Sequence, residues 1–303
     1  MELEQEGQGM TGPDPYFEQP RGVMTVIVDG FRLALRALSG AWVPVVMTVI
    51  IYLFIGPTMR ALTGIDPYDL GFGVPEQTAP LVSESTAAVA LGLYGLVNIL
   101  LLMWVFALLL QHMQRAAIPG DASTQDPVSA IGALRRVPAM IGASLLVAFI
   151  LVLSMALMAR AFVALDGMLA LVLMLMAVTI GGILTLVLML GPALPVLEKT
   201  GPIASLSRST RLVWPCWLRI SWLFLLVVLL NIAVTLVMAL AVTLLIQLLH
   251  PETLSSILGW ILNPLFGVGY MLFGAGLTVS LYYDLLARRA AAGDDVEAEA
   301  SLS

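Results

Sequence analysis

The chain has 303 residues, of which 60% are hydrophobic and only 11% are charged. A soluble globular domain is nearer to half apolar and a quarter charged, so this composition excludes a water-soluble fold. The net charge of −6 and the lack of a basic patch argue against a nucleic-acid partner. The single cysteine, Cys216, excludes an intramolecular disulfide and a thiolate zinc site.

The first twenty residues predict an acidic, disordered cytoplasmic tail, because a secretory signal needs a basic start followed by a short apolar core. We therefore expect the first apolar span to direct insertion. The acidic residues are Glu2, Glu4, Glu6, Asp14 and Glu18.

Long apolar runs then predict an all-α, polytopic membrane protein with six transmembrane helices. About 20 helical residues cross a hydrocarbon layer of roughly 30 Å. The first run is short and needs interfacial flanks or a thinner bilayer. The six runs are Ala41–Pro57, Thr86–Leu110, Ala139–Ala159, Gly167–Leu197, Trp217–Leu249 and Ile257–Leu286.

The positions of lysine and arginine predict the orientation. All fourteen basic residues except Arg60 and Arg160 fall on one side of the predicted spans. This asymmetry predicts that both ends of the chain lie in the cytoplasm.

The three inner segments also resemble one another, which predicts three units of a cytoplasmic interfacial amphipathic helix and a transmembrane hairpin, at about 21–112, 128–199 and 202–289. The acidic residues 290–303 would form a tail. The alternative is that any inner loop contains basic amphipathic sequence. In the first copy one helical stripe is polar, with Arg21, Thr25, Asp29, Arg32 and Arg36, and the opposite side is apolar, with Met24, Ile27, Phe31, Leu35 and Leu38. The second and third copies are Val128–Val137 and Pro202–Leu212.

Two segments carry a family resemblance. One is Glu198–Leu212 (EKTGPIASLSRSTRL), followed by Trp214 and Trp217, and the other is Leu281–Arg289 (LYYDLLARR). Together they resemble the membrane domain that some bacteria place ahead of a glycerophosphodiester phosphodiesterase, and the related YciC-like inner-membrane proteins. The resemblance covers roughly residues 20–296 and implies a six-span fold in the bacterial inner membrane. It does not transfer the hydrolase activity, because both tails are too short for that domain. Leu286 and the run Ala290–Ala292 depart from the family pattern.

Asp284 is the foremost candidate functional residue, because it sits at the end of the last span, where the helix dipole disfavours an anion. Arg288 can pair with it along the helix. One interpretation is a structural clamp to the third interfacial helix. The other is a lipid-headgroup or phosphate site built from arginine forks. The residues of this second site would be Arg208, Arg211, Tyr283 and Arg288, and Arg36, Arg135 and Arg136 are further headgroup candidates.

Polar residues inside the spans are few. Asn98 and Asn231 predict hydrogen bonds between helices, and a glycine-rich stretch in the last span predicts close packing there. His112 and His250 fall at opposite membrane faces, so they cannot share a metal. No serine has a base histidine nearby, so we expect no catalytic residue, cofactor or metal. The glycines are Gly267, Gly269, Gly274 and Gly276.

These observations favour a non-enzymatic membrane scaffold or accessory protein that contacts anionic lipids, and a membrane-protein partner is a second expectation. The alternatives are a transporter or flippase for an amphipathic solute, suggested by kinked spans and the two asparagines, and a lipid-modifying enzyme, suggested only by the fused relatives.

Overall fold

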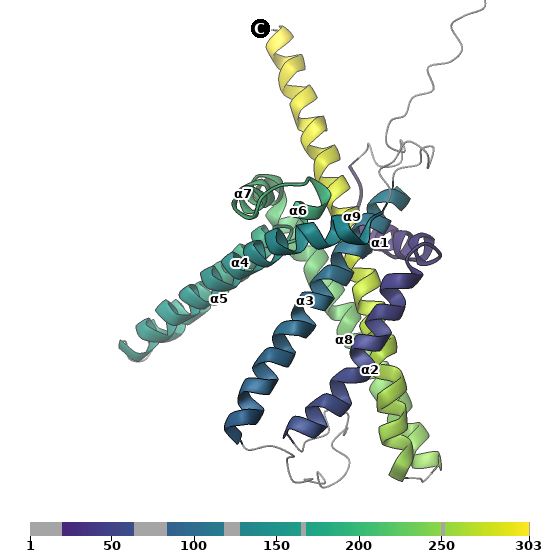
Figure 1. Cartoon of the computed structure of the whole chain (residues 1–303). Coiled ribbons are helices and arrows are strands. Elements are labelled where there is room, and N and C mark those ends of the chain that lie inside the picture. Colours follow the sequence, from purple (N-terminus) through teal and green to yellow (C-terminus); the bar gives the residue numbers. More distant parts are fainter. Residues whose placement is uncertain (1–19, 64–83, 118–127, 165–167, 250–251, 303) are drawn as a thin grey trace, which may run out of the picture.

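The structure is a computed structural model that describes residues 20–63, 84–117, 128–164, 168–249 and 252–302. All secondary structure in these ranges is helical. Figure 1 shows helices that fan out from a crowded end, where α1, α6 and α7 lie beside the middle of α9. Apart from Pro20, the predicted acidic tail lies outside the described residues.

The chain forms nine α-helices and one 3-10 turn in its described part. The first half contains α1 Val23–Leu38, α2 Trp42–Thr63, α3 Glu84–Ala117, α4 Ala130–Ala164 and α5 Met168–Leu188. The second half contains α6 Leu194–Leu197, α7 Pro202–Val213, η2 Trp214–Cys216, α8 Trp217–Leu249 and α9 Glu252–Leu302.

Four described helical segments are long and apolar enough to cross a membrane. A fifth is present if the bent pair formed by α1 and α2 counts as one span. The four segments are Val89–Ala117, Ala130–Leu153, Pro202–Ala241 and Pro264–Gly293. The chain is therefore an all-helical protein with several apolar helices of membrane-spanning length, which indicates a membrane-embedded protein.

The junctions between the predicted interfacial helices and spans differ from one another. α1 and α2 meet at 98° across the turn at Ser39 and Gly40. The second junction is not a break, since α4 runs continuously through Pro138. The prediction of a separate helix at Val128–Val137 was therefore wrong. A single proline costs one backbone hydrogen bond, whereas a break in an apolar segment would leave several groups unsatisfied.

Two further segments differ from the sequence prediction. α7 follows the predicted third interfacial helix closely, and η2 then joins it to α8. The last helix, α9, extends to Leu302, so the predicted acidic tail after Arg289 is helical where the structure describes it.

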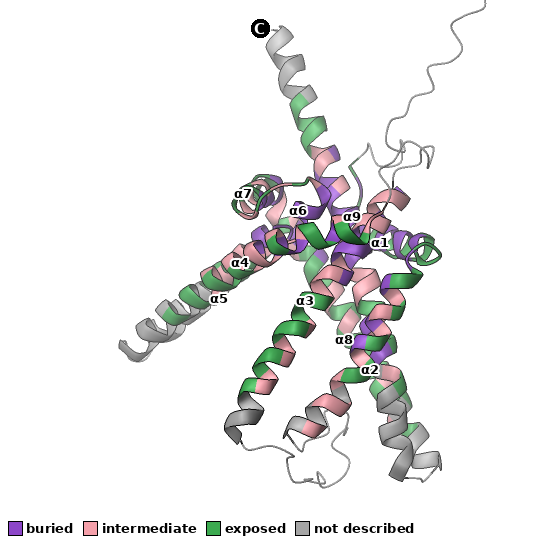
Figure 2. Cartoon of the chain, in the orientation of Figure 1, coloured by how far each residue is buried: buried purple, intermediate pink, exposed green. Residues whose placement is uncertain are grey.

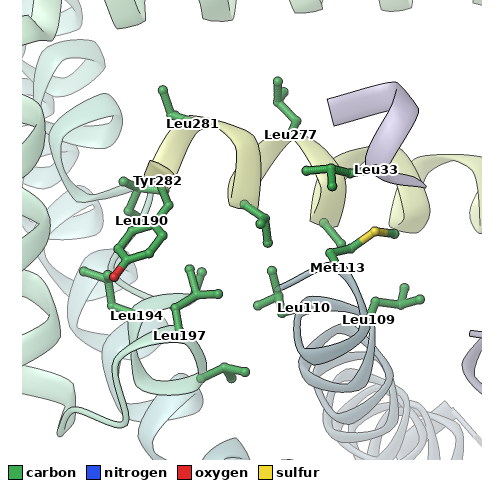
Figure 3. Packing of buried hydrophobic residues seen from close by; sticks show 14 of the residues in the cluster. Leu33, Leu109, Leu110, Met113, Leu190, Leu194, Leu197, Leu277, Leu281 and Tyr282 are labelled. Carbon is green, nitrogen blue, oxygen red and sulfur yellow. The ribbon is translucent and has the colours of Figure 1, made fainter. Parts of the chain in front are cut away.

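The core lies at the crowded end, where α9 packs against α1, α2, α3, α7 and α8. Figure 2 shows buried residues gathered there, while the far parts of α3, α4 and α8 are mostly exposed where burial is described. Leucines dominate this core. The side chains labelled in Figure 3 are Leu33, Leu109, Leu110, Met113, Leu190, Leu194, Leu197, Leu277, Leu281 and Tyr282.

A glycine contact sets how closely α1 and α9 approach. A Cβ added to Gly276 would lie 2.2 Å from the carbonyl oxygen of Gly30, and a Cβ on Gly30 would lie 2.8 Å from the Cα of Leu277. Neither position can hold a larger residue without moving the backbone. Gly267 lies against the ring of Tyr52 in α2, as the predicted close packing requires. The other two glycines of the stretch, Gly269 and Gly274, face open space.

Candidate functional site

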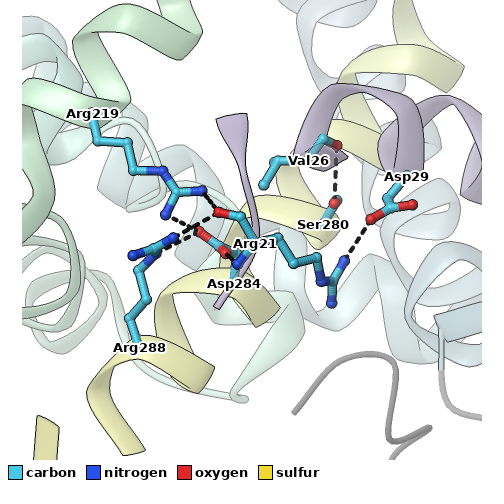
Figure 4. A network of polar contacts seen from close by, with 7 residues as sticks. All are labelled: Arg21, Val26, Asp29, Arg219, Ser280, Asp284 and Arg288. Carbon is cyan, nitrogen blue, oxygen red and sulfur yellow. Dashed lines mark hydrogen bonds and ion pairs between the residues drawn. The ribbon is translucent and has the colours of Figure 1, made fainter. Parts of the chain in front are cut away.

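The carboxylate of Asp284 is the centre of a buried polar network at the crowded end (Figure 4). The residue is only 1% exposed. Its Oδ2 lies 3.1 Å from Nε of Arg288, one turn on in α9, and 3.2 Å from Nη1 of Arg219 in α8. Two guanidinium groups therefore offset the charge of this buried anion. The helix dipole expected to disfavour Asp284 does not act on it, because α9 continues to Leu302 and the effect is confined to the last turn of a helix.

The backbone of Arg21 completes this network. Its N–H donates to Oδ1 of Asp284 at 2.8 Å, and its carbonyl accepts hydrogen bonds from Nη2 of Arg288 at 2.7 Å and from Nη2 of Arg219. The segment just before α1 is thus held between α8 and α9 by main-chain atoms. Residues almost 270 positions apart in sequence meet here, since Arg21 and Arg288 differ by 267.

The side chain of Arg21 binds a second carboxylate. Its Nη1 lies 2.9 Å from Oδ2 of Asp29 in α1, and both side chains are almost fully buried. Arg32 lies 3.7 Å from the other oxygen of Asp29, with a side chain that is 60% exposed. Ser280 adds a link between α9 and α1 by donating to the carbonyl of Val26 at 3.0 Å. The polar stripe predicted for α1 is therefore split, with one part buried and another exposed.

A second, smaller cluster surrounds Glu198, between α6 and α7. Arg208 in α7 pairs with its carboxylate, with Nε at 3.1 Å from Oε1. The hydroxyl of Tyr282 in α9 donates to the same oxygen at 3.0 Å. Glu198 thus connects α7 to α9.

The structure separates the residues of the predicted headgroup site. Arg208 belongs to the Glu198 cluster, and Arg211 is exposed on α7. The partners of Asp284 are instead Arg288, as predicted, together with Arg219 and the backbone of Arg21. The other headgroup candidates lie at the surface: Arg36 and Arg135 are exposed and Arg136 is half-buried.

The sequence analysis used Arg219 for the orientation rule and Arg21 for that rule and the polar stripe of the first interfacial helix, and it placed neither in a site. No local signal could have found them, because they reach Asp284 across more than 60 residues of sequence in one case and 260 in the other. The helical spacing of Arg288 was enough to predict its pairing correctly.

α1 presents two different surfaces outside the core. The first is an apolar stripe, and the second carries Arg32 and Arg36. Phe31 and Leu35 are 55% and 57% exposed. Ile27, predicted to belong to the apolar stripe, is buried against the core instead. The exposed stripe consists of Met24, Val28, Phe31, Leu35 and Leu38.

The amide of Asn98 has a local partner. Its Nδ2 donates to the carbonyl of Tyr94 at 2.9 Å, one turn back in α3. This contact differs from the predicted hydrogen bond to another helix. Asn231 is half-buried in α8.

Fold and site together define a class: an all-helical protein with several apolar helices of membrane-spanning length and buried ion pairs at one end. No family model, curated protein or solved structure matches this chain. The resemblance to the phosphodiesterase-associated membrane domain therefore stays a prediction from the quoted residues.

Proposed function

We propose that this chain is a multi-pass membrane protein whose crowded end binds anionic lipid headgroups, and that it serves as a scaffold or accessory protein. We call this region the basic end. It comprises α1, α7, the start of α8, the last turns of α3 and the turns of α9 that directly precede Gly293. The observation that carries the proposal is the exposed surface of α1, where an apolar stripe lies beside Arg32 and Arg36.

The direction of α1 supports an interfacial position. Because α1 meets α2 at 98°, a spanning α2 places α1 near the plane of the membrane. A helix in that plane inserts its apolar stripe below the headgroups and turns its basic side chains toward them. Residues such as Phe31 and Arg36 meet this requirement on adjoining surfaces of one helix.

Two exposed tryptophans support placing the membrane–water interface at the level of α1. Trp42 is 64% exposed at the start of α2, and Trp214 is 60% exposed at the junction of α7 with α8. Tryptophan favours the membrane–water interface, where its ring is apolar and its N–H is hydrated. Both rings lie next to a basic segment, which is the arrangement that an interfacial belt requires.

The finer topology belongs to this proposal. Six spans in three hairpins, with both ends in the cytoplasm of a bacterial inner membrane, agree with the distribution of arginine. α5, which has 21 residues, would then be the fourth span. Anionic lipids concentrate in a cytoplasmic leaflet and attract basic side chains by about 1 kcal/mol each.

Native mass spectrometry of the purified protein tests the lipid proposal. The protein is exchanged into nanodiscs with phosphatidylglycerol or with phosphatidylcholine alone, and released with its bound lipids. We expect retention of phosphatidylglycerol, with a loss of about fivefold for Arg32→Gln or Arg36→Gln, since each removes about 1 kcal/mol of attraction. Arg160→Gln is the matched control, because Arg160 lies on the opposite side of the predicted spans, away from the basic end. Equal retention of both lipids by the wild type would contradict the proposal.

A further inference from the structure

We propose that Arg219 and Arg288 form a phosphate-binding pair at the edge of the Asp284 network. The ligand class is a phosphate group with one negative charge, supplied by a phospholipid headgroup or by a soluble phosphate. This inference deepens the proposed function and rests on it for the location at a membrane surface.

The positive charge of the two arginines exceeds the negative charge of the carboxylate that they share. Arg219 and Arg288 share one carboxylate, that of Asp284, and the side chain of Arg21 is paired separately with Asp29. The three groups Arg219, Arg288 and Asp284 therefore carry a net charge of about +1 in a partly desolvated place. One phosphodiester would neutralise it, which makes a single phosphate the matching ligand.

The two guanidinium groups also carry more N–H donors than the network offers acceptors for them. Each guanidinium carries five N–H groups. The network engages Nη1 and Nη2 of Arg219 and Nε and Nη2 of Arg288, all directed at Asp284 or at the carbonyl of Arg21. Nη1 of Arg219 lies within ion-pair distance of Asp284, yet it is buried without an aligned hydrogen bond. Donors thus remain on both arginines after the network is counted.

The geometry brings these two groups together. Both guanidinium groups contact the same carbonyl oxygen, so the contacting nitrogens lie within about 6 Å of each other. Figure 4 shows the two side chains approaching that oxygen from α8 and α9. The side chains are 21% and 29% exposed, which leaves an accessible edge. Arginine forks bind phosphate oxygens in pairs, whereas lysine offers only a point charge.

Asp284 is a positioning residue in this arrangement. It holds both guanidinium groups but repels an incoming anion. Removing its charge while keeping an acceptor should therefore strengthen phosphate binding, even though it weakens the fold. A purely structural network predicts no phosphate binding to any variant, so the two accounts are separable.

The test uses the full chain in an uncharged maltoside detergent and phosphate-free buffer. Inorganic phosphate and dihexanoyl phosphatidylglycerol are titrated separately, and binding is followed by native mass spectrometry and by the rise in unfolding temperature. We expect Arg219→Gln and Arg288→Gln to weaken binding about tenfold or more. Arg288→Lys, which keeps the charge and loses the fork, should weaken it less, and Asp284→Asn should strengthen it several-fold. Arg289→Gln, which removes the next arginine in sequence, should bind as the wild type does.

The two probes distinguish the sources. Saturation by inorganic phosphate assigns a site for a phosphate group itself, and saturation by the short-chain lipid alone assigns a headgroup site. Failure of both probes, or equal binding by folded Arg219→Gln and Arg288→Gln proteins, would overturn the inference. Neither probe depends on α1, so Arg32→Gln can lose phosphatidylglycerol in the nanodisc test while phosphate binding persists. This outcome separates the inference from the proposed function.

Discussion

The basic end and the distal parts of the helices follow different packing rules. The apolar segment Pro264–Gly293 is buried over a much larger share of its residues than the apolar segment Pro202–Ala241. The first segment contains Gly276, Ser280 and Asp284, each in contact with α1 or the residues before it. The second continues into the leucine-rich part of α8, which is exposed through most of its length.

The difference shows what fixes helix contacts in an apolar solvent. Exchanging lipid for leucine gains little, because both are apolar, so glycine contacts and polar links decide which helices associate. The basic end has several such links and closes around them. The described part of α8 beyond Leu223 has few, and its surface suits lipid chains.

The largest effect should come from removing the carboxylate of Asp284. Asp284→Ala removes the acceptor of three donors, namely one N–H each from Arg219 and Arg288 and the backbone N–H of Arg21. This loss should cost about 3–5 kcal/mol. Unfolding in detergent by a denaturing surfactant, followed by circular dichroism, measures the loss. Arg289→Ala is the control and should change stability little, because Arg289 is exposed. Equal stability of both variants would contradict a structural role for the network.

A somewhat smaller effect is expected at the helix crossing. In Gly276→Ala the new methyl group would overlap the carbonyl of Gly30, which is backbone and cannot rotate away. We expect a loss of about 1–3 kcal/mol. Gly274→Ala, two residues earlier, has open space and should be neutral or slightly stabilising, because alanine favours a helix. If both substitutions behaved alike in the same unfolding assay, the crossing would not set the packing.

The link between α7 and α9 should contribute less. Tyr282→Phe removes the hydroxyl that donates to Glu198, and we expect a loss of about 1 kcal/mol. Tyr270→Phe is the matched control, because Tyr270 is 52% exposed in the same helix. Protease accessibility of α7 offers a local readout. Cleavage that rises equally in both variants would argue against a role for this hydrogen bond.

The smallest effect should occur in the distal part of α8. Leu236 is 68% exposed, so Leu236→Ala should change stability by less than about 0.5 kcal/mol. Leu110, which is fully buried at the basic end, is the counterpart, and Leu110→Ala should cost about 2–5 kcal/mol. Similar losses of stability for the two leucines in detergent would show that packing at the basic end contributes no more to stability than packing in the distal part of α8.

Sequence reasoning predicted the helices well, but it missed one of the three junctions between the predicted interfacial helices and the spans. Runs of apolar residues specified α2, α3 and α8, because a span needs a minimum length that few other structures share. The break at Gly40 was expected from the change of pattern between the amphipathic stretch and the span at Ala41. The continuity at Pro138 depends on satisfying backbone groups in an apolar segment, which a local pattern does not encode.

The site was predictable only where its residues are close in sequence. Arg288 follows Asp284 by one helical turn, so their pairing could be read from spacing. Arg219 and the backbone of Arg21 reach Asp284 through the fold, and no periodicity predicts that. Arg208 was placed near Asp284 by sequence, but it binds Glu198, which lies closer along the chain.

The depth of α1 in a membrane tests the central claim most directly. Spin labels are attached at Phe31→Cys, Leu35→Cys and Arg36→Cys in a Cys216→Ser background, and each protein is reconstituted in vesicles containing phosphatidylglycerol. The account predicts that labels at positions 31 and 35 collide with oxygen and are protected from a water-soluble nickel chelate, while the label at position 36 shows the reverse. Equal exposure of all three labels to the nickel chelate would contradict an interfacial α1, and with it the lipid-binding basic end.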